Sequence, residues 1–383
     1  MSVTSAQGFR ASGVAAGLKA SGRPDVALVV NDGPLEVAAG VFTSNRVKAA
    51  PVLWSQQVVT DGELRAVALN SGGANACTGP DGFADTHRSA ESVAALLGIG
   101  AGEVAVCSTG LIGERLPMGK LLDGFDQAAQ TLSTDGGDAA AVAIMTTDTV
   151  PKTAAITTNG FVVGGMAKGA GMLAPGMATM LSTITTDAVI SAELADSALI
   201  AAVATTFDRV DSDGCMSTND TVLLLASGAS GVEPSEADFK VALTTVCARL
   251  ARALVADAEG ASKEIQIDVV GAPSDADATR AARSVARSNL FKCAMYGEDP
   301  NWGRVISAVG ATSVEFDPNL IDVQINGAQV CRGGAAGADR STVDLTGRVI
   351  TVVIDLHAGS STSTVWTNDL TAAYVHENSA YST

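Results

Sequence analysis

The stretch AKGAGMLAPGMATMLSTITTDA, residues 167–188, changes character at Thr179. Its first half consists of glycine, alanine and other uncharged residues, with a single lysine at Lys168. Residues 178–186 are rich in threonine, leucine and isoleucine, a composition typical of a buried β-strand. The sequence therefore predicts a glycine-rich loop that leads directly into a strand, with a threonine at the junction.

The loop partly matches the pattern of nucleotide-binding loops. GAGMLA, residues 169–174, fits the spacing GxGxxA, which in dinucleotide-binding proteins follows a strand and opens a helix. Pro175 and Gly176 would end such a helix at once, and the stretch lacks the GK[ST] end of a phosphate-binding loop. We do not expect nucleotide binding here. On spacing alone, a plain loop before a buried strand is the simplest interpretation.

A threonine at this junction also suits one kind of catalysis. A threonine hydroxyl is a weak nucleophile without a neighbouring base, and an N-terminal threonine supplies that base as its own α-amine, with a pKa of about 8. Thr179 would become N-terminal if the bond between Ala178 and Thr179 were cut. Small residues before that bond would let the backbone open for attack by Oγ on the preceding carbonyl. The hypothesis is a self-cleaving loop before a nucleophile strand.

Composition narrows the possible partners. The chain has 383 residues, of which 47% are hydrophobic and 17% charged, enough for a substantial core. Its formal net charge of −17 would repel nucleic acid and anionic membrane surfaces. No run approaches the roughly 18 apolar residues of a membrane span, and residues 1–22 lack the apolar centre of a signal peptide. We expect a cytoplasmic protein that binds neither nucleic acid nor membranes.

The cysteines and histidines do not indicate a metal site. The six cysteines are scattered, without a CxxC pair or a histidine at ligand spacing, which argues against zinc and against a disulfide framework. The three histidines, His87, His357 and His376, lie outside any recognisable nucleophile motif. Catalysis by a Ser-His-Asp or Cys-His group therefore stays open but has no motif to support it.

Strand and helix patterns alternate along the chain. Residues 26–31 and 38–43 flank DGPLEV and predict a hairpin, and Asn159-Gly160 and Asn326-Gly327 predict two hairpins with type I′ turns. Apolar residues at three-to-four spacing after Ser, Asp or Pro predict helices at 80–98, 191–210, 235–260 and 275–291. The mixture indicates an α/β or α+β protein without repeats or a clear linker; residues 227–238 are the best loop candidate.

Several longer motifs occur in a fixed order. GFRASGVAAGLK, NSGGANACTG, CSTGLIGERLP and AIMTTDTVPK precede the opening stretch, and DSDGCMSTNDT, DAEGASK, YGEDPNWGR and HENSAYST follow it. Together they closely resemble the ornithine acetyltransferase, or glutamate N-acetyltransferase, family of bifunctional arginine-biosynthesis proteins, over essentially the whole chain. The resemblance implies a DmpA/ArgJ-like, self-cleaving N-terminal-nucleophile fold of the α/β class with mixed sheets and helices.

The resemblance also implies roles for single residues. Thr179 would both cleave the chain after Ala178 and accept the acetyl group, leaving an α chain, 1–178, and a β chain, 179–383, that stay associated. Thr109 and Gly110 match the family's oxyanion-stabilising pair. The positions that match substrate-binding residues are Thr146, Lys168, Thr179, Glu259, Asn378 and Thr383. A lysine can pair with a substrate carboxylate, and a glutamate can pair with a substrate ammonium group. Threonine and asparagine can hydrogen-bond to both kinds of group.

The implied reaction is ping-pong acetyl transfer from N2-acetyl-L-ornithine to L-glutamate through an acetyl-threonine ester, with no metal and no organic cofactor. Acetyl-CoA is a second candidate donor, and no residue in the sequence decides that question. The implied assembly is a heterotetramer of two α and two β chains.

Two alternatives stay open at this point. A hydrolytic relative, an amidase or aminopeptidase, would use the same nucleophile with water as the acceptor. A metabolite-binding protein would keep the chain uncut, and Thr179 would never be released as a terminal residue. Dependence on an amine acceptor separates the first alternative from a transferase, and a denaturing gel separates the second.

Overall fold

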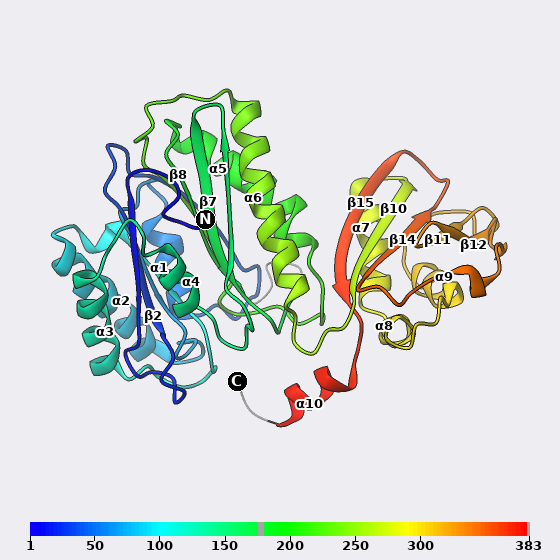
Figure 1. The fold of residues 1–383 in the computed structure, drawn as a ribbon, viewed down its shortest axis with the longest axis horizontal. Helices are drawn as coiled ribbons and strands as arrows, with labels where there is room; N and C mark the ends of the chain where they lie inside the picture. Colours follow the sequence, from blue (N-terminus) through cyan, green and yellow to red (C-terminus); the bar gives the residue numbers. More distant parts are fainter. Residues whose placement is uncertain (175–179, 381–383) are drawn as a thin grey trace. The chain divides into compact units, whose positions relative to one another are not determined.

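The computed structural model describes residues 1–174 and 180–380, which form two compact units (Figure 1). Unit 1 contains the described residues of Met1–Asp208 and Cys215–Leu254, and unit 2 contains Arg209–Gly214 and the described chain from Val255 onward. Within the described residues, no helix is long and apolar enough to cross a membrane.

Unit 1 contains a four-stranded sheet in the order β1-β2-β4-β5, with β4 and β5 parallel and the other pairs antiparallel. Its strands are β1 (Phe9–Val14), β2 (Val26–Asn31), β4 (Ala66–Asn70) and β5 (Val104–Ser108). One face packs against three helices through a core that includes Leu28, Trp54, Val93 and Phe125. These helices are α1 (Ala50–Val58), α2 (Gly79–Leu97) and α3 (Met118–Gln130).

A five-stranded sheet completes unit 1, in the order β3-β9-β8-β7-β6. Its strands are β3 (Val37–Phe42), β6 (Lys152–Thr158), β7 (Phe161–Lys168), β8 (Leu181–Thr186) and β9 (Thr221–Ala226). β8 is buried at every residue, runs parallel to β9 and antiparallel to β7. The strand that follows the glycine-rich loop is therefore at the centre of its sheet.

The two sheets of unit 1 face each other. A shared core joins them and includes Phe9 and Val29 of one sheet, Met166 and Leu223 of the other, and α4 (Gly137–Ala143). On the outer side of the five-stranded sheet, α5 (Ala192–Thr205) contacts β3 and β9, and Phe239 of α6 (Glu236–Ala256) lies 6.4 Å from Phe161 between ring centroids. Unit 1 thus stacks helices, sheet, sheet and helices, as Figure 1 shows.

Unit 2 is built on a six-stranded mixed sheet in the order β13-β12-β11-β14-β10-β15. α7 packs on β10 and β15 over an aliphatic core. The strands are β10 (Glu264–Ala272), β11 (Asp322–Ile325), β12 (Ala328–Arg332), β13 (Ala335–Ala336), β14 (Val349–Asp355) and β15 (Ser361–Asn368). The helices are α7 (Asp275–Ala286), α8 (Asn289–Tyr296), α9 (Trp302–Gly310) and α10 (Ala372–Ala380). The described residues also form three short 3-10 helices: η1 (Ala101–Glu103) in unit 1, η2 (Phe207–Arg209) at the point where the chain passes from unit 1 to unit 2, and η3 (Arg340–Thr342) in unit 2.

Most local predictions are confirmed. Both Asn-Gly pairs form two-residue hairpin turns, between β6 and β7 and between β11 and β12, and all four turn residues have positive φ, between 45° and 86°. The predicted strand before residue 186 is β8. Residues 169–174 form no helix, which agrees with the rejection of a dinucleotide-binding loop.

Two local predictions are wrong. Residues 26–31 and 38–43 do not form a hairpin, because β2 pairs with β1 and β4 while β3 pairs with β9 in the other sheet. β1 and β4 already pair with the two edges of β2 and take its backbone hydrogen bonds, so no edge is left for β3. The single helix predicted for 275–291 is two helices, because the Ser288 hydroxyl accepts from the N–H of Phe291 and starts α8.

Candidate active site

The candidate site lies where β7 ends and β8 begins. Lys168, the last residue of β7, pairs in register with Leu181, the first residue of β8. The N–H of Met180 donates to Oδ1 of Asp220 at 3.0 Å, and this bond fixes the start of β8. Ala178 and Thr179 lie outside the described residues, so the cleavage site and the nucleophile remain predictions.

Lys168 brings the two sheets together at this place. Its side chain is buried, and Nζ donates to Oγ1 of Thr109 at 3.2 Å. Thr109 follows β5 and is held by its backbone, which donates to the carbonyl of Asn70 and accepts from the N–H of Gly73, both at 3.0 Å. A hydroxyl that accepts from an ammonium keeps its own hydrogen to donate elsewhere. The arrangement therefore suits Thr109 as a donor to an oxyanion.

Gly110 occupies a place that other residues fit poorly. Its φ is +132°, and a Cβ built there would lie 2.8 Å from the backbone nitrogen of Gly73. Gly113, three residues on, also has a positive φ of +92°, but a Cβ there would meet nothing within 4 Å. The predicted oxyanion pair thus sits on a turn whose close approach to residue 73 requires glycine.

Thr146 and Lys168 are connected through a buried carboxylate, Asp148. One oxygen of Asp148 accepts from the N–H of Thr146 at 2.9 Å, and the other accepts from the N–H of Gly169 at 2.7 Å and from Nζ of Lys152. Burial pushes the pKa of Asp148 upward, but the charges of Lys168 and Lys152 outweigh it and bring that pKa to about 2. The carboxylate is therefore ionised and balances two buried ammonium groups.

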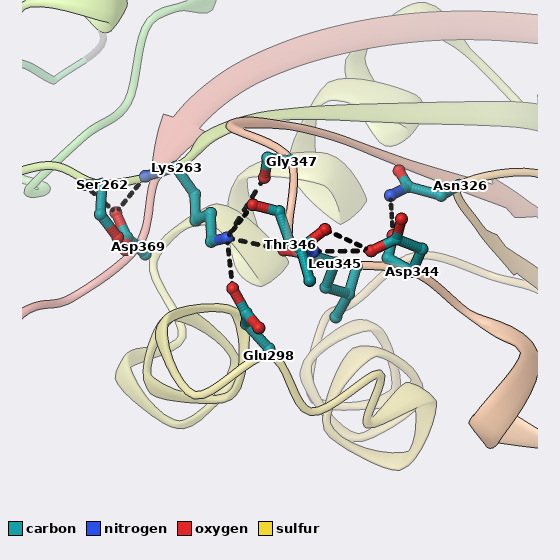
Figure 2. Close-up of polar contacts among 9 residues, drawn as sticks. All are labelled: Ser262, Lys263, Glu298, Asn326, Asp344, Leu345, Thr346, Gly347 and Asp369. Carbon is teal, nitrogen blue, oxygen red and sulfur yellow. Dashed lines mark hydrogen bonds and ion pairs between the residues drawn. The ribbon is translucent and has the colours of Figure 1, made fainter.

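In unit 2, Glu259 follows α6, and its Oε2 accepts from Nδ2 of Asn378 in α10 at 3.1 Å. Figure 2 shows how the next residues are anchored: Asp369 accepts from the N–H groups of Ser262 and Lys263, both at 2.9 Å. The Lys263 ammonium pairs with Glu298 at 2.8 Å. Glu259 also lines a cavity of about 290 Å³ in this unit. Thr383 lies outside the described residues.

The structure therefore brings the predicted residues together in two groups. Thr109, Gly110, Thr146 and Lys168 belong to unit 1, and Glu259 and Asn378 belong to unit 2. Sequence reasoning assigned no role to Asp148 or Lys152, although AIMTTDTVPK contains both. The only available signal was a charged pair at i and i+4, which is usually a solvated pair on a helix surface.

Comparison with known proteins identifies the family. The model of the ArgJ family matches residues 10–383. The chain belongs to the ArgJ family.

Relatives agree with that assignment. The arginine biosynthesis bifunctional protein ArgJ of Streptomyces coelicolor is 63% identical over 382 residues, covering 100% of both chains. A solved ArgJ chain from Bacillus halodurans is 36% identical, with a TM-score of 0.50, and the match covers 52% of this chain and 97% of that one. A chain of ornithine acetyltransferase from Mycobacterium tuberculosis, crystallised with ornithine, is 63% identical over 47% of this chain and 96% of its own, with a TM-score of 0.45. The resemblance and the ArgJ-like α/β fold with mixed sheets are confirmed.

Replacing Asp148 tests the buried charge cluster. Asp148→Ala should lower the free energy of unfolding by about 3–5 kcal/mol, because it leaves buried ammonium groups without their carboxylate. The native pKa lies below the unfolded value, so this stabilisation is present above pH of about 4 and is lost as pH falls toward 2. Denaturant unfolding at pH 7 and pH 3 measures both effects. Asp126→Ala, on the exposed side of α3, is the control; an equal loss in both variants would contradict the cluster.

Two glycine variants test the turn beside Thr109. Gly110→Ala and Gly113→Ala both place alanine at positive φ, but only the first also forces a Cβ against the backbone of Gly73. We expect Gly110→Ala to cost more stability than Gly113→Ala by at least about 1 kcal/mol. Thermal unfolding of both variants measures the difference. Equal melting temperatures would show that the turn can move away from residue 73.

Proposed function

We propose that this protein transfers the acetyl group of N2-acetyl-L-ornithine to L-glutamate through an ester on Thr179. Membership of the ArgJ family supports the reaction, since full-length relatives are named for arginine biosynthesis. The observation that carries the mechanism is the contact between Lys168 and Thr109, because it prepares a hydroxyl donor beside the start of β8. Such a donor is what an acyl-transfer site needs for its oxyanion.

The chemical steps follow from an N-terminal threonine. Oγ of Thr179 adds to the acetyl carbonyl and gives its proton to the α-amine of the same residue. The Thr109 hydroxyl and the Gly110 N–H donate to the oxygen that becomes negative. The C–N bond then breaks, the α-nitrogen of ornithine takes up the proton, and the acetyl ester remains. The α-amine of glutamate attacks this ester and regenerates the hydroxyl.

Substrate binding is proposed for the residues that match the family. In unit 1, the buried ammonium of Lys168 suits the α-carboxylate of a substrate. Thr146 offers a hydroxyl next to Asp148, the side chain whose charge also stabilises Lys168. Glu259 and Asn378 of unit 2 are also proposed to bind substrate. The same role is proposed for Thr383. Acetyl-CoA is proposed as a second donor, since relatives are called bifunctional. Formation of N-acetylglutamate from acetyl-CoA alone tests that second activity.

Maturation is proposed to cut the chain between Ala178 and Thr179. The strand order supports lasting association of the two products, because β8 and β9 of the β chain would lie between β7 and β3 of the α chain. The Bacillus halodurans chain is about half as long as this one, as expected for one product of such a cut. Two α and two β chains would form the heterotetramer.

Denaturing mass spectrometry tests maturation. The purified protein should give fragments 1–178 and 179–383, and Thr179→Ala should give one chain, because its side chain lacks the attacking oxygen. On native gel filtration the two fragments should elute together, because separation would break six residue pairs between β7 and β8. Cleavage at residue 179 in the alanine variant would exclude self-cleavage.

The covalent intermediate is the direct test of the reaction. Incubation with acetylornithine alone should add one acetyl group at Thr179, located by fragmentation, and glutamate should remove it. Thr109→Ala should slow its formation by about a hundredfold, because one oxyanion donor is lost. Thr60→Ala is the control, because Thr60 is exposed and its hydroxyl donates only to the carbonyl of Gln56 among the described contacts. Absence of the adduct in the cleaved wild-type protein under rapid quenching would refute the ester.

A further inference from the structure

Asn219 is a buried side chain that ties the end of β5 to the segment before β9. It is 4% exposed, and Nδ2 donates to the carbonyls of Ala74 at 2.6 Å and Ser108 at 2.8 Å. Its Oδ1 accepts from the Thr218 hydroxyl at 2.6 Å. Both amide N–H groups are thus used, and one of them holds the residue directly before Thr109.

The next residue, Asp220, makes the corresponding connection to β8. It is fully buried, and Oδ1 accepts from the N–H of Met180, the residue after Thr179. Oδ2 is buried and has no hydrogen-bond partner among the described residues. Burial raises the pKa of Asp220 well above its usual range, against the lowering effects of the Met180 N–H, the Lys168 charge and the nearby hydroxyls of Ser217 and Thr43. Burial therefore disfavours the charged form of this carboxyl.

The Asp220 side chain is costly for a purely structural role. The backbone already joins β8 to β9 at this point, since the N–H of Thr221 donates to the carbonyl of Met180 at 3.1 Å. A buried carboxyl oxygen without a partner costs free energy that an apolar side chain would avoid. Such a group in a folded protein calls for an explanation in function.

We propose that Asn219 and Asp220 are positioning residues that set the nucleophile and the oxyanion donor at a fixed separation. Asn219 holds Ser108, the residue before Thr109, while the adjacent Asp220 holds Met180, the residue after Thr179 in the sequence. The inference rests on the proposed function for the roles of Thr179 and Thr109. Neither residue touches the acetyl group.

Four variants test this arrangement. Asn219→Ala and Asp220→Ala remove each connection, Asn219→Ser keeps one donor, and Asp220→Asn keeps the shape and the acceptor for Met180. Asn45→Ala is the matched control, because Nδ2 of Asn45 donates to the carbonyl of Met216 in the same loop, and no hydrogen bond among the described residues joins Asn45 to β5 or β8. For each cleaved variant, the melting temperature, the rate of acetyl-enzyme formation, KM and amide exchange at Thr109 and Met180 are measured.

A positioning role predicts a split between rate and binding. Both alanine variants should form the acetyl-enzyme about a hundredfold more slowly, as expected for a displacement of about 1 Å at a reacting group, with KM within about twofold. Asp220→Asn should recover most of the rate. Exchange should rise at Met180 in Asp220→Ala and at Thr109 in Asn219→Ala, and the Asn45 control should change neither.

Other outcomes identify which claim fails. Lower melting temperatures with wild-type rates of acetyl-enzyme formation in the alanine variants would overturn the positioning role. If an alanine variant does not fold, Asn219→Ser and Asp220→Asn decide, because a full rate in Asn219→Ser together with unchanged exchange at Thr109 would also overturn it. If the wild-type protein forms no acetyl-enzyme, the proposed function fails instead. Amide exchange at Thr109 and Met180 then tests the two connections by itself, and unchanged exchange in the alanine variants would show that the connections do not exist.

Discussion

A buried positive charge at Lys168 organises the candidate site. Asp148 stabilises the ammonium at the end of β7 with an ionised carboxylate, itself held by the N–H groups of Thr146 and Gly169. The same ammonium donates to Thr109 in the opposite sheet and so leaves that hydroxyl's hydrogen for an incoming oxygen. The charge therefore links the stability of unit 1 to the chemistry proposed for it.

The strand order gives that site its rigidity. β8 lies in the middle of its sheet and is buried at every residue, so the strand itself has little freedom to move. A cut before residue 179 would release a new terminus without releasing the strand, because β7 and β9 hold β8 on both sides. A nucleophile placed on such a terminus needs little reorganisation to react, which is how positioning contributes to rate.

The sequence predicts what depends on neighbours along the chain. Two Asn-Gly turns, the buried strand β8 and the helices α2, α5 and α6 follow from local patterns, because turn conformation and amphipathic spacing involve only a few consecutive residues. The pairing of β2 and β3 with strands of different sheets does not follow, since it depends on burial across the fold. Asp148 and Asp220 were missed for the same reason. Their importance comes from interactions with Lys168 and Met180, which lie 20 or more residues away in the sequence and which no local motif connects to them.

The central claim is that acetyl rests on the enzyme between two separate half-reactions. Initial rates with acetylornithine and glutamate both varied test it most directly, because ornithine must leave before glutamate reacts. The account predicts parallel lines in double-reciprocal plots, with the apparent KM for each substrate rising in proportion to the apparent maximal rate. Intersecting lines would contradict it and would indicate direct transfer between two substrates bound together.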